Sequence, residues 1–257
     1  ISGETHIYCG TCYQCMIGNF HLCERMKLRG VDTDGCFSEY VLISEKTAWK
    51  NDPSIKPIVA SAQEPLGNAV HSVFSGEVTA RSVVIFGSGP IGLCAIALCK
   101  SSGAEKVVAV DISDYRLGLA AKMGADELID GSKKDVRGAI ARILPSGADV
   151  ILEMSGSEKA LNDGLKVVRA GGRVTLLGLP GDKVSIDLSN DVILKGLTLQ
   201  GIFGRKIFAT WELSSRLLKH GSIDLEKIIT HRLKIEDYKN AFKLMSEGKC
   251  GKIVMTF

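Results

Sequence analysis

The stretch SVVIFGSGPIGLCAIALCKSSGAEKVVAVD, residues 82–111, decides the fold of this chain. An apolar run, Val83–Phe86, meets a Gly-rich turn, and an apolar helical stretch, Leu93–Lys100, follows it. A second apolar run, Val107–Val110, ends at Asp111, 19 residues after the last glycine of the turn. Strand, G-x-G-x-x-G, helix, strand and acid in this order predict a βαβ unit that binds a dinucleotide.

Each part of this pattern has a physical role in holding a dinucleotide. Gly87 permits the tight turn, Gly89 lets the backbone approach a pyrophosphate, and Gly92 lets the helix pack against the strand. The helix N-terminus offers free N–H groups and a positive dipole end to the phosphates. Asp111 is expected to accept hydrogen bonds from the adenosine ribose hydroxyls and to repel a 2′-phosphate, which favours NAD over NADP.

Bulk properties narrow the class of protein. The uncharged run at 82–99 is long enough to suggest a membrane helix, but glycines and a proline interrupt it, so a buried strand and a buried helix fit better. A net charge of +3 is too small to indicate nucleic acid or a membrane surface. The opening ISGETH has neither the basic nor the apolar region of a secretory signal, and a cytoplasmic protein is expected.

Four of the eight cysteines form a second strong motif near the start of the chain. Cys9, Cys12, Cys15 and Cys23 have the spacing C-x2-C-x2-C-x7-C. Four thiolates complete a tetrahedron around Zn²⁺ and leave no open position, so the predicted site is structural. Disulfides and an iron–sulfur cluster are the alternatives; the first needs an oxidising compartment and the second has other spacings. The remaining cysteines are interpreted as small core residues.

Beyond Asp111 strands and helices keep alternating, which predicts an α/β fold with a parallel, doubly wound sheet. The expected elements are a helix capped by Ser113, a strand at 127–129, a helix at 133–144, a strand at 148–154, a helix at 157–169 ended by Gly171 and Gly172, and strands at 173–177 and 197–203. Ligands bind beyond the carboxyl ends of such strands, so residues 178–180 and 202–205 are expected near the cofactor.

The segments on either side of this unit carry weaker signals. Residues 35–43 predict a strand, and residues 58–74 predict a helical stretch broken at Pro65, with Glu64 just before a helix start. An acid at that position could simply complement the helix dipole. His71 is interpreted as a packing residue. The tail predicts two amphipathic helices and a closing strand, at 211–220, 236–247 and the last residues.

With GVDTDGCFSEY (30–40), QEPLGNAVHSV (63–73) and AFKLMSEGKCGKIVM (241–255), the chain resembles the zinc-dependent medium-chain alcohol dehydrogenases over essentially its whole length. The resemblance implies part of a GroES-like catalytic domain with a zinc lobe at 1–66, a Rossmann NAD-binding domain at 67–206, and a return to the catalytic domain at 207–257. It also implies oxidation of L-threonine to 2-amino-3-ketobutyrate by hydride transfer to NAD⁺, in a homotetramer.

The resemblance also implies roles for individual residues. The four cysteines match structural zinc ligands, and Glu64 falls where the family places an acid beside the catalytic zinc. The residues matched to the pyrophosphate and adenosine are Gly87, Gly89, Pro90, Ile91, Gly92, Asp111 and Arg116. Those matched to the nicotinamide are Leu177, Gly178, Leu179, Ile202 and Phe203.

One departure from the family limits these expectations. The family's N-terminal quarter, with the Cys and Gly-His-Glu ligands of the catalytic zinc and the Thr and His of the proton relay, has no counterpart in this sequence. Glu64 alone cannot hold that metal. The chain as given is expected to bind NAD and structural zinc but to oxidise little or no threonine, whereas the full-length protein would be the enzyme. A sorbitol- or butanediol-type polyol dehydrogenase and a non-catalytic NAD-binding zinc protein are the alternatives.

Overall fold

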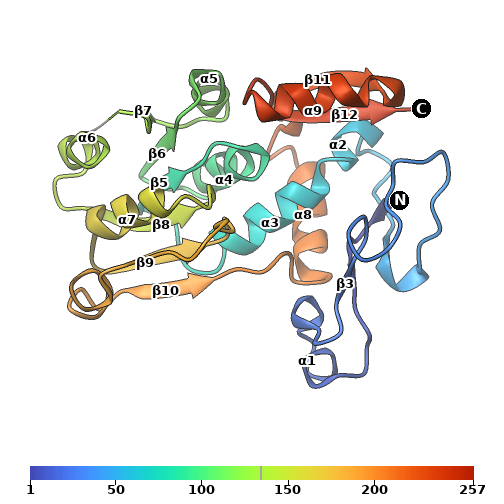
Figure 1. Cartoon of the computed structure of the whole chain (residues 1–257), viewed down its shortest axis with the longest axis horizontal. Helices are drawn as coiled ribbons and strands as arrows, with labels where there is room; N and C mark the ends of the chain where they lie inside the picture. The colour runs from blue at the N-terminus through green and yellow to red at the C-terminus, as the bar shows by residue number, and fades with distance from the viewer. Residues whose placement is uncertain (134) are drawn as a thin grey trace.

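A six-stranded parallel sheet forms the centre of the computed structural model, which describes residues 1–133 and 135–257 (Figure 1). The strand order is β10-β9-β8-β5-β6-β7, so the chain winds outward in both directions from β5, and the predicted doubly wound fold is confirmed. The strands are β5 (Ser82–Phe86), β6 (Lys106–Asp111), β7 (Glu127–Asp130), β8 (Ala148–Glu153), β9 (Val168–Leu176) and β10 (Thr198–Gly201).

Helices cover both faces of this sheet, which is why the central strand β5 is buried along its whole length and apolar from Val83 to Phe86. Val83 and Ile85 face a core built with α3 (Gln63–Val73), α4 (Pro90–Ser101) and α5 (Asp114–Lys122). Val84 and Phe86 face the opposite core, which α6 (Val136–Ile143) and α7 (Glu158–Val167) complete. Alternate residues of a strand point to opposite faces, so β5 belongs to both cores.

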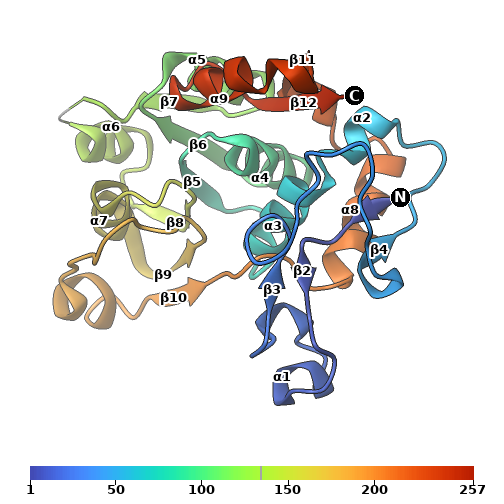
Figure 2. The same cartoon turned by 45° about the vertical axis from the view of Figure 1, so that its right-hand side comes forward.

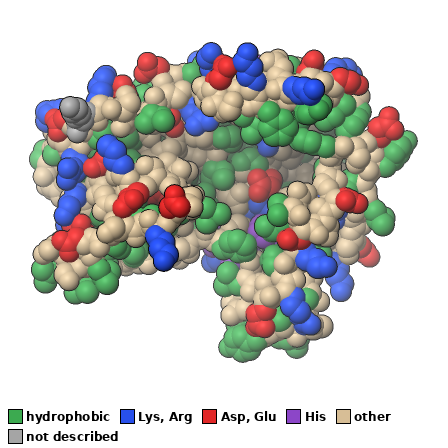
Figure 3. Space-filling model, viewed as in Figure 1, with side chains coloured by type: hydrophobic (Ala, Val, Ile, Leu, Met, Phe, Trp, Pro, Cys, Tyr) green, Lys and Arg blue, Asp and Glu red, His purple; other side chains and the backbone are tan. Residues whose placement is uncertain are grey.

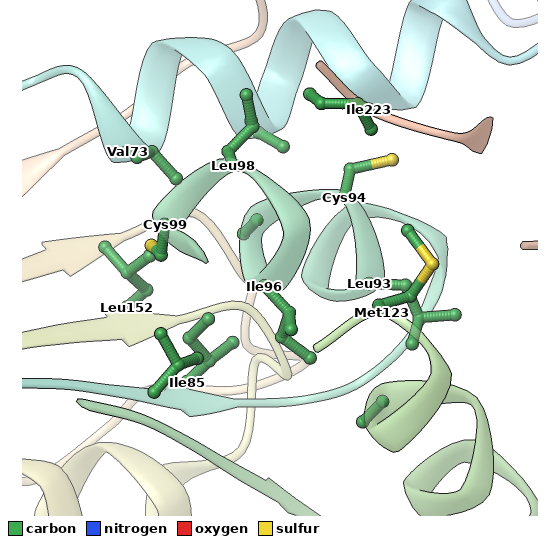
Figure 4. Close-up of a cluster of buried hydrophobic side chains, with 14 of the residues drawn as sticks. Val73, Ile85, Leu93, Cys94, Ile96, Leu98, Cys99, Met123, Leu152 and Ile223 are labelled. Carbon is green, nitrogen blue, oxygen red and sulfur yellow. The ribbon is translucent and has the colours of Figure 1, made fainter. Parts of the chain in front are cut away.

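Helix α4 lies at the middle of the first core. Figure 4 shows Leu93, Ile96 and Leu98 of this helix among side chains from the sheet and from α3. All three side chains are fully buried, and each contributes about 1.5–3 kcal/mol relative to an exposed position. This packing fixes the N-terminus of α4 at the carboxyl end of β5. No helix of the described residues is long and apolar enough to cross a membrane.

The N-terminal part is made of short elements around a projecting zinc lobe (Figures 1 and 2). They are β1 (Ser2–Gly3), β2 (His6–Ile7), α1 (Tyr13–Met16), β3 (Lys27–Leu28), β4 (Ala48–Trp49) and α2 (Pro57–Ala60). The strand predicted at 35–43 is wrong: the backbone there is irregular, and Tyr40 and Leu42 are 89% and 93% exposed. The helical stretch breaks between α2 and α3, at Ser61 and Ala62 rather than at Pro65.

The tail returns across the molecule toward the N-terminal part (Figures 1 and 2). It contains α8 (Ala209–Lys219), β11 (Ile229–Lys234), α9 (Tyr238–Ser246) and β12 (Lys252–Thr256). Helix α8 packs against α3, and β11 pairs in parallel with β12. Strand β11 was not predicted. Gly171 and Gly172 do not follow a helix as expected; they lie within β9, which begins directly after α7.

Candidate functional site

The Gly-rich turn joins β5 to α4 in the conformation that an anion site requires. Gly87 has φ +95°, and a Cβ on Gly92 would collide with the carbonyl oxygen of Gly87. A Cβ on Gly89 would meet nothing within 4 Å, so this face of the turn is open. Gly89 caps α4 without a side-chain hydrogen bond, which leaves the first N–H groups of the helix free for phosphate oxygens.

Asp111 lies at the end of β6, against the same turn. Its Oδ2 accepts a hydrogen bond from the Ser88 amide at 2.6 Å, and its Oδ1 accepts one from the Ser113 amide at 2.9 Å. These amides fix the carboxylate on the wall of a cavity of about 330 Å³, where an acidic group favours a ribose diol over a phosphate. Predicted residues that line this cavity are Gly87, Gly89, Asp111 and Arg116.

A second cavity, of about 580 Å³, continues from the first. Ser157 lines both, so the two are parts of one groove along the carboxyl ends of the strands. The second cavity collects all the residues that were matched to the nicotinamide: Leu177, Gly178, Leu179, Ile202 and Phe203. Pro90, Ile91 and Gly92 line neither cavity; they form the first turn of α4 beneath the groove.

Two histidines and a lysine share the second cavity with these residues. His21 and His71 pack edge to face, with ring centroids 5.3 Å apart, and Lys206 lines the same cavity. Burial lowers the pKa of His71, and burial lowers the pKa of His21 to about 4, so both imidazoles are neutral at pH 7. His71 was interpreted from sequence as a packing residue, and nothing in its helical context indicates that it lines a cavity.

Glu64 lies in a different environment, at the first turn of α3. Its carboxylate pairs with the guanidinium of Arg205, which is fully buried and also pairs with the buried Glu4. Trp211 Nε1 donates to Glu4 Oε2 at 2.7 Å. In Figure 3 the molecule is hollowed between the zinc lobe and the sheet, and acidic and histidine side chains are visible in the hollow.

The four cysteines of the zinc lobe converge as predicted. Their sulfur atoms lie within 4.8 Å of one another, and tetrahedral zinc with 2.3 Å bonds places sulfurs about 3.8 Å apart. All four are free thiols, which argues against the disulfide alternative. Hydrogen bonds from Thr11, together with one from the Cys12 amide, lower the pKa of Cys9 to about 5, and thiolate is the form that zinc binds. The cluster therefore fits a structural zinc ion.

Family comparisons assign the chain. Residues 90–220 match the family model described as zinc-binding dehydrogenase, and residues 2–53 match the alcohol dehydrogenase GroES-like domain. The chain belongs to the zinc-binding dehydrogenase family. It is 47% identical to L-threonine 3-dehydrogenase of Bacillus licheniformis over 99% of this chain and 74% of that protein. It is 48% identical to the Pyrococcus furiosus enzyme of the same name, with the same coverage.

Solved structures agree with this assignment. An alcohol dehydrogenase from Escherichia coli, complexed with NADH, has a TM-score of 0.92 and 26% identity over 99% of this chain and 76% of that one. A zinc-binding dehydrogenase from Sinorhizobium meliloti, bound to NADP, has a TM-score of 0.88 and 31% identity over 99% and 74%. This zinc-binding dehydrogenase is accordingly an oxidoreductase with a Rossmann-type sheet and a zinc lobe.

The structure also brings together residues whose contacts the sequence did not predict. Glu4 and Arg205 are 201 positions apart and line neither cavity; Arg205 falls within 202–205, the range expected near the cofactor, but its pairing with Glu4 was not predicted. His21 lies between Cys15 and Cys23. The spacing of the cysteines predicts a zinc site but gives no role to this histidine. The one local signal is the basic pair Arg205 and Lys206, which follows the predicted strand at 197–203 after Gly204.

Proposed function

We propose that this zinc-binding dehydrogenase oxidises L-threonine to 2-amino-3-ketobutyrate with NAD⁺. The observation that carries the proposal is the continuous groove with Asp111 on the wall of one end and the predicted nicotinamide residues at the other. Its similarity to enzymes named L-threonine 3-dehydrogenase supports the substrate. When bound, NAD⁺ would accept the hydride from the substrate carbon, and the proton of the substrate hydroxyl would pass to solvent.

The chain's own residues bind and orient the reactants. The amides at the start of α4 receive the pyrophosphate, Asp111 selects the unphosphorylated ribose, and Arg116 lines the adenosine end with its buried Nε free of a protein partner. Backbone groups at 177–179 and 202–203 hold the other end of the dinucleotide. Leu179 and Phe203 give the wall of the second cavity two apolar side chains.

A catalytic zinc does not fit the residues that the structure describes. Glu64 is engaged by Arg205, and within the described ranges three or more metal-ligating groups meet only at the four cysteines. We therefore assign Glu64 a positioning role through Arg205 and no step through a second metal. The chain spans about three quarters of the length of the relatives it matches, and we expect the 257 residues by themselves to oxidise threonine slowly.

The test is NADH formation in the presence of L-threonine, sorbitol or 2,3-butanediol. It compares the 257-residue chain with a fusion that places the N-terminal segment of the Bacillus subtilis relative before Ile1. We expect the fusion to form NADH with threonine, the chain alone to bind NADH with little turnover, and both to prefer NAD over NADP. Turnover of a polyol instead of threonine, a preference for NADP, or equal rates for chain and fusion would contradict the proposal.

We further propose a cytoplasmic homotetramer. Free cysteines at all eight positions support the cytoplasm, where thiols stay reduced. The free edge of β10, the last strand of the sheet, supports self-association.

A further inference from the structure

Lys206 is a cation without an acidic partner in the second cavity. It follows the buried Arg205, which pairs with Glu4 and Glu64, whereas Lys206 is exposed and lines the cavity. Among the described residues, no carboxylate lies within 4.0 Å of its ammonium group. Glu153, the acid in the cavity wall, is committed to Ser155 and to the Gly156 amide.

His71 brings a hydrogen-bond acceptor to the same cavity. Its Nδ1 lies 2.9 Å from the carbonyl oxygen of Gly204, and a carbonyl only accepts, so Nδ1 carries the proton. The neutral ring therefore presents a lone pair at Nε2, for which the described residues provide no hydrogen bond. Beside it lies His21, which is only 7% exposed. Its Nδ1 is buried and has no hydrogen-bond partner among the described residues. Such unused polar capacity in a cavity wall indicates a ligand.

The bound dinucleotide does not account for these groups. Its phosphates belong to the amides at the start of α4, and its nicotinamide end carries a neutral carboxamide and, when oxidised, a positive ring. Lys206 lines the same cavity as the residues matched to the nicotinamide, and its ammonium group is available there to an anion from a second molecule. An α-amino acid brings both complements, a carboxylate for the lysine and an ammonium for the imidazole lone pair.

We propose that Lys206 and His71 bind the α-carboxylate and the α-ammonium group of an amino-acid substrate. The inference rests on the proposed function and deepens it, because it explains why a dehydrogenase of this fold would accept an amino acid rather than a simple polyol. Lys206 acts as the charge partner of the carboxylate, and the Gly204 carbonyl holds His71 in the tautomer that accepts from the ammonium. His21 packs against His71 and keeps its ring in place.

Binding to the chain–NADH complex, measured by calorimetry, tests this site with three ligands. L-Threonine carries both charged groups, 1-aminopropan-2-ol lacks the carboxylate, and 3-hydroxybutyrate lacks the ammonium. Lys206→Met should weaken binding of threonine and 3-hydroxybutyrate about tenfold or more and leave aminopropanol unchanged. His71→Asn keeps a donor near the position of Nδ1 but removes Nε2, so it should weaken threonine and aminopropanol and leave 3-hydroxybutyrate unchanged.

The matched control is Lys243→Met, an exposed lysine on α9 outside the groove, which should change none of the three affinities. Unchanged NADH affinity and thermal unfolding establish that the variants fold. If Lys206→Met instead weakens NADH, the lysine serves a dinucleotide phosphate and the inference is wrong. If the wild-type chain binds threonine and both variants retain that binding, the inference fails while the proposed function stands. If it binds none of the three ligands, the inference is wrong, and NADH formation by the fusion decides the proposed function separately.

Discussion

Arg205 is fully buried, and two carboxylates, those of Glu4 and Glu64, neutralise its charge. Burial raises the pKa of Glu4, but hydrogen bonds from His6 and Arg205 outweigh it and hold the pKa well below the usual range. A lowered pKa stabilises the folded state at pH values above the unfolded pKa, about 4.3, and this contribution is lost as pH falls further.

Glu4→Gln should therefore lower the free energy of unfolding by about 1–3 kcal/mol at pH 7, because the buried guanidinium loses one of its two charged partners and keeps only Glu64. The stability of the variant should also depend less on pH below about 4.3 than that of the wild type. Urea unfolding at pH 7, 5 and 3 measures both effects. Glu105→Gln, at an exposed glutamate, is the control, and a loss of similar size in the control would contradict this assignment.

At the residue scale, sequence reasoning succeeded where a role depends on neighbours along the chain. The four cysteines lie within 15 residues, and the short loops between them bring the sulfurs together. Glu4 and Arg205 meet only because α8 and the loop before it return to the N-terminal strands, so no local pattern contains their pairing. His71 looked like a core residue because its helix is buried on nearly all sides.

At the scale of the element, the Gly-rich turn depends on one glycine for packing. Gly92→Ala would place a methyl group against the Gly87 carbonyl and push α4 away from β5. We expect a loss of about 1–3 kcal/mol in unfolding free energy and weaker NADH binding, since the displaced helix N-terminus carries the phosphate site. Thermal unfolding and NADH fluorescence measure the two effects.

Gly118 provides the matched control because it lies on an exposed face of α5 with nothing within 4 Å of an added Cβ. Gly118→Ala should stabilise the protein by about 0.5–1 kcal/mol, as alanine does in a helix interior, with no change in NADH affinity. If both substitutions behave alike, close packing at the turn is not what Gly92 provides.

The sequence predicted elements correctly where a run of apolar residues corresponds to a segment buried on both sides, as in β5, β6 and α4. It failed at 35–43, where the apolar residues are exposed and no neighbouring strand of the described residues pairs with them. It also missed β11, whose alternation is weak because His231 and Arg232 stand at its centre. Tertiary pairing decides such segments, and a single sequence does not contain it.

At the scale of the whole molecule, the sheet ends in an unpaired edge. Among the residues that the structure describes, β10 pairs only with β9, so one row of its backbone groups is free for a further strand. Leu199 of β10 is exposed, and so are three apolar side chains in the segment before this strand: Leu188, Ile193 and Leu194. A second copy of the chain that pairs through β10 would satisfy the free amides and carbonyls and cover these side chains.

Leu199→Lys should therefore shift the protein toward smaller species. If β10 pairs with β10 of a second copy, the two introduced lysines would be buried close to each other and would repel. Light scattering coupled to gel filtration measures the mass. Leu213→Lys on α8 is matched in exposure, at 37% for both leucines, and should leave the mass unchanged. The edge strand is the wrong interface if both variants keep the wild-type mass. A wild-type monomer would contradict the tetramer itself, and β10 would then be an edge that the protein leaves open to solvent.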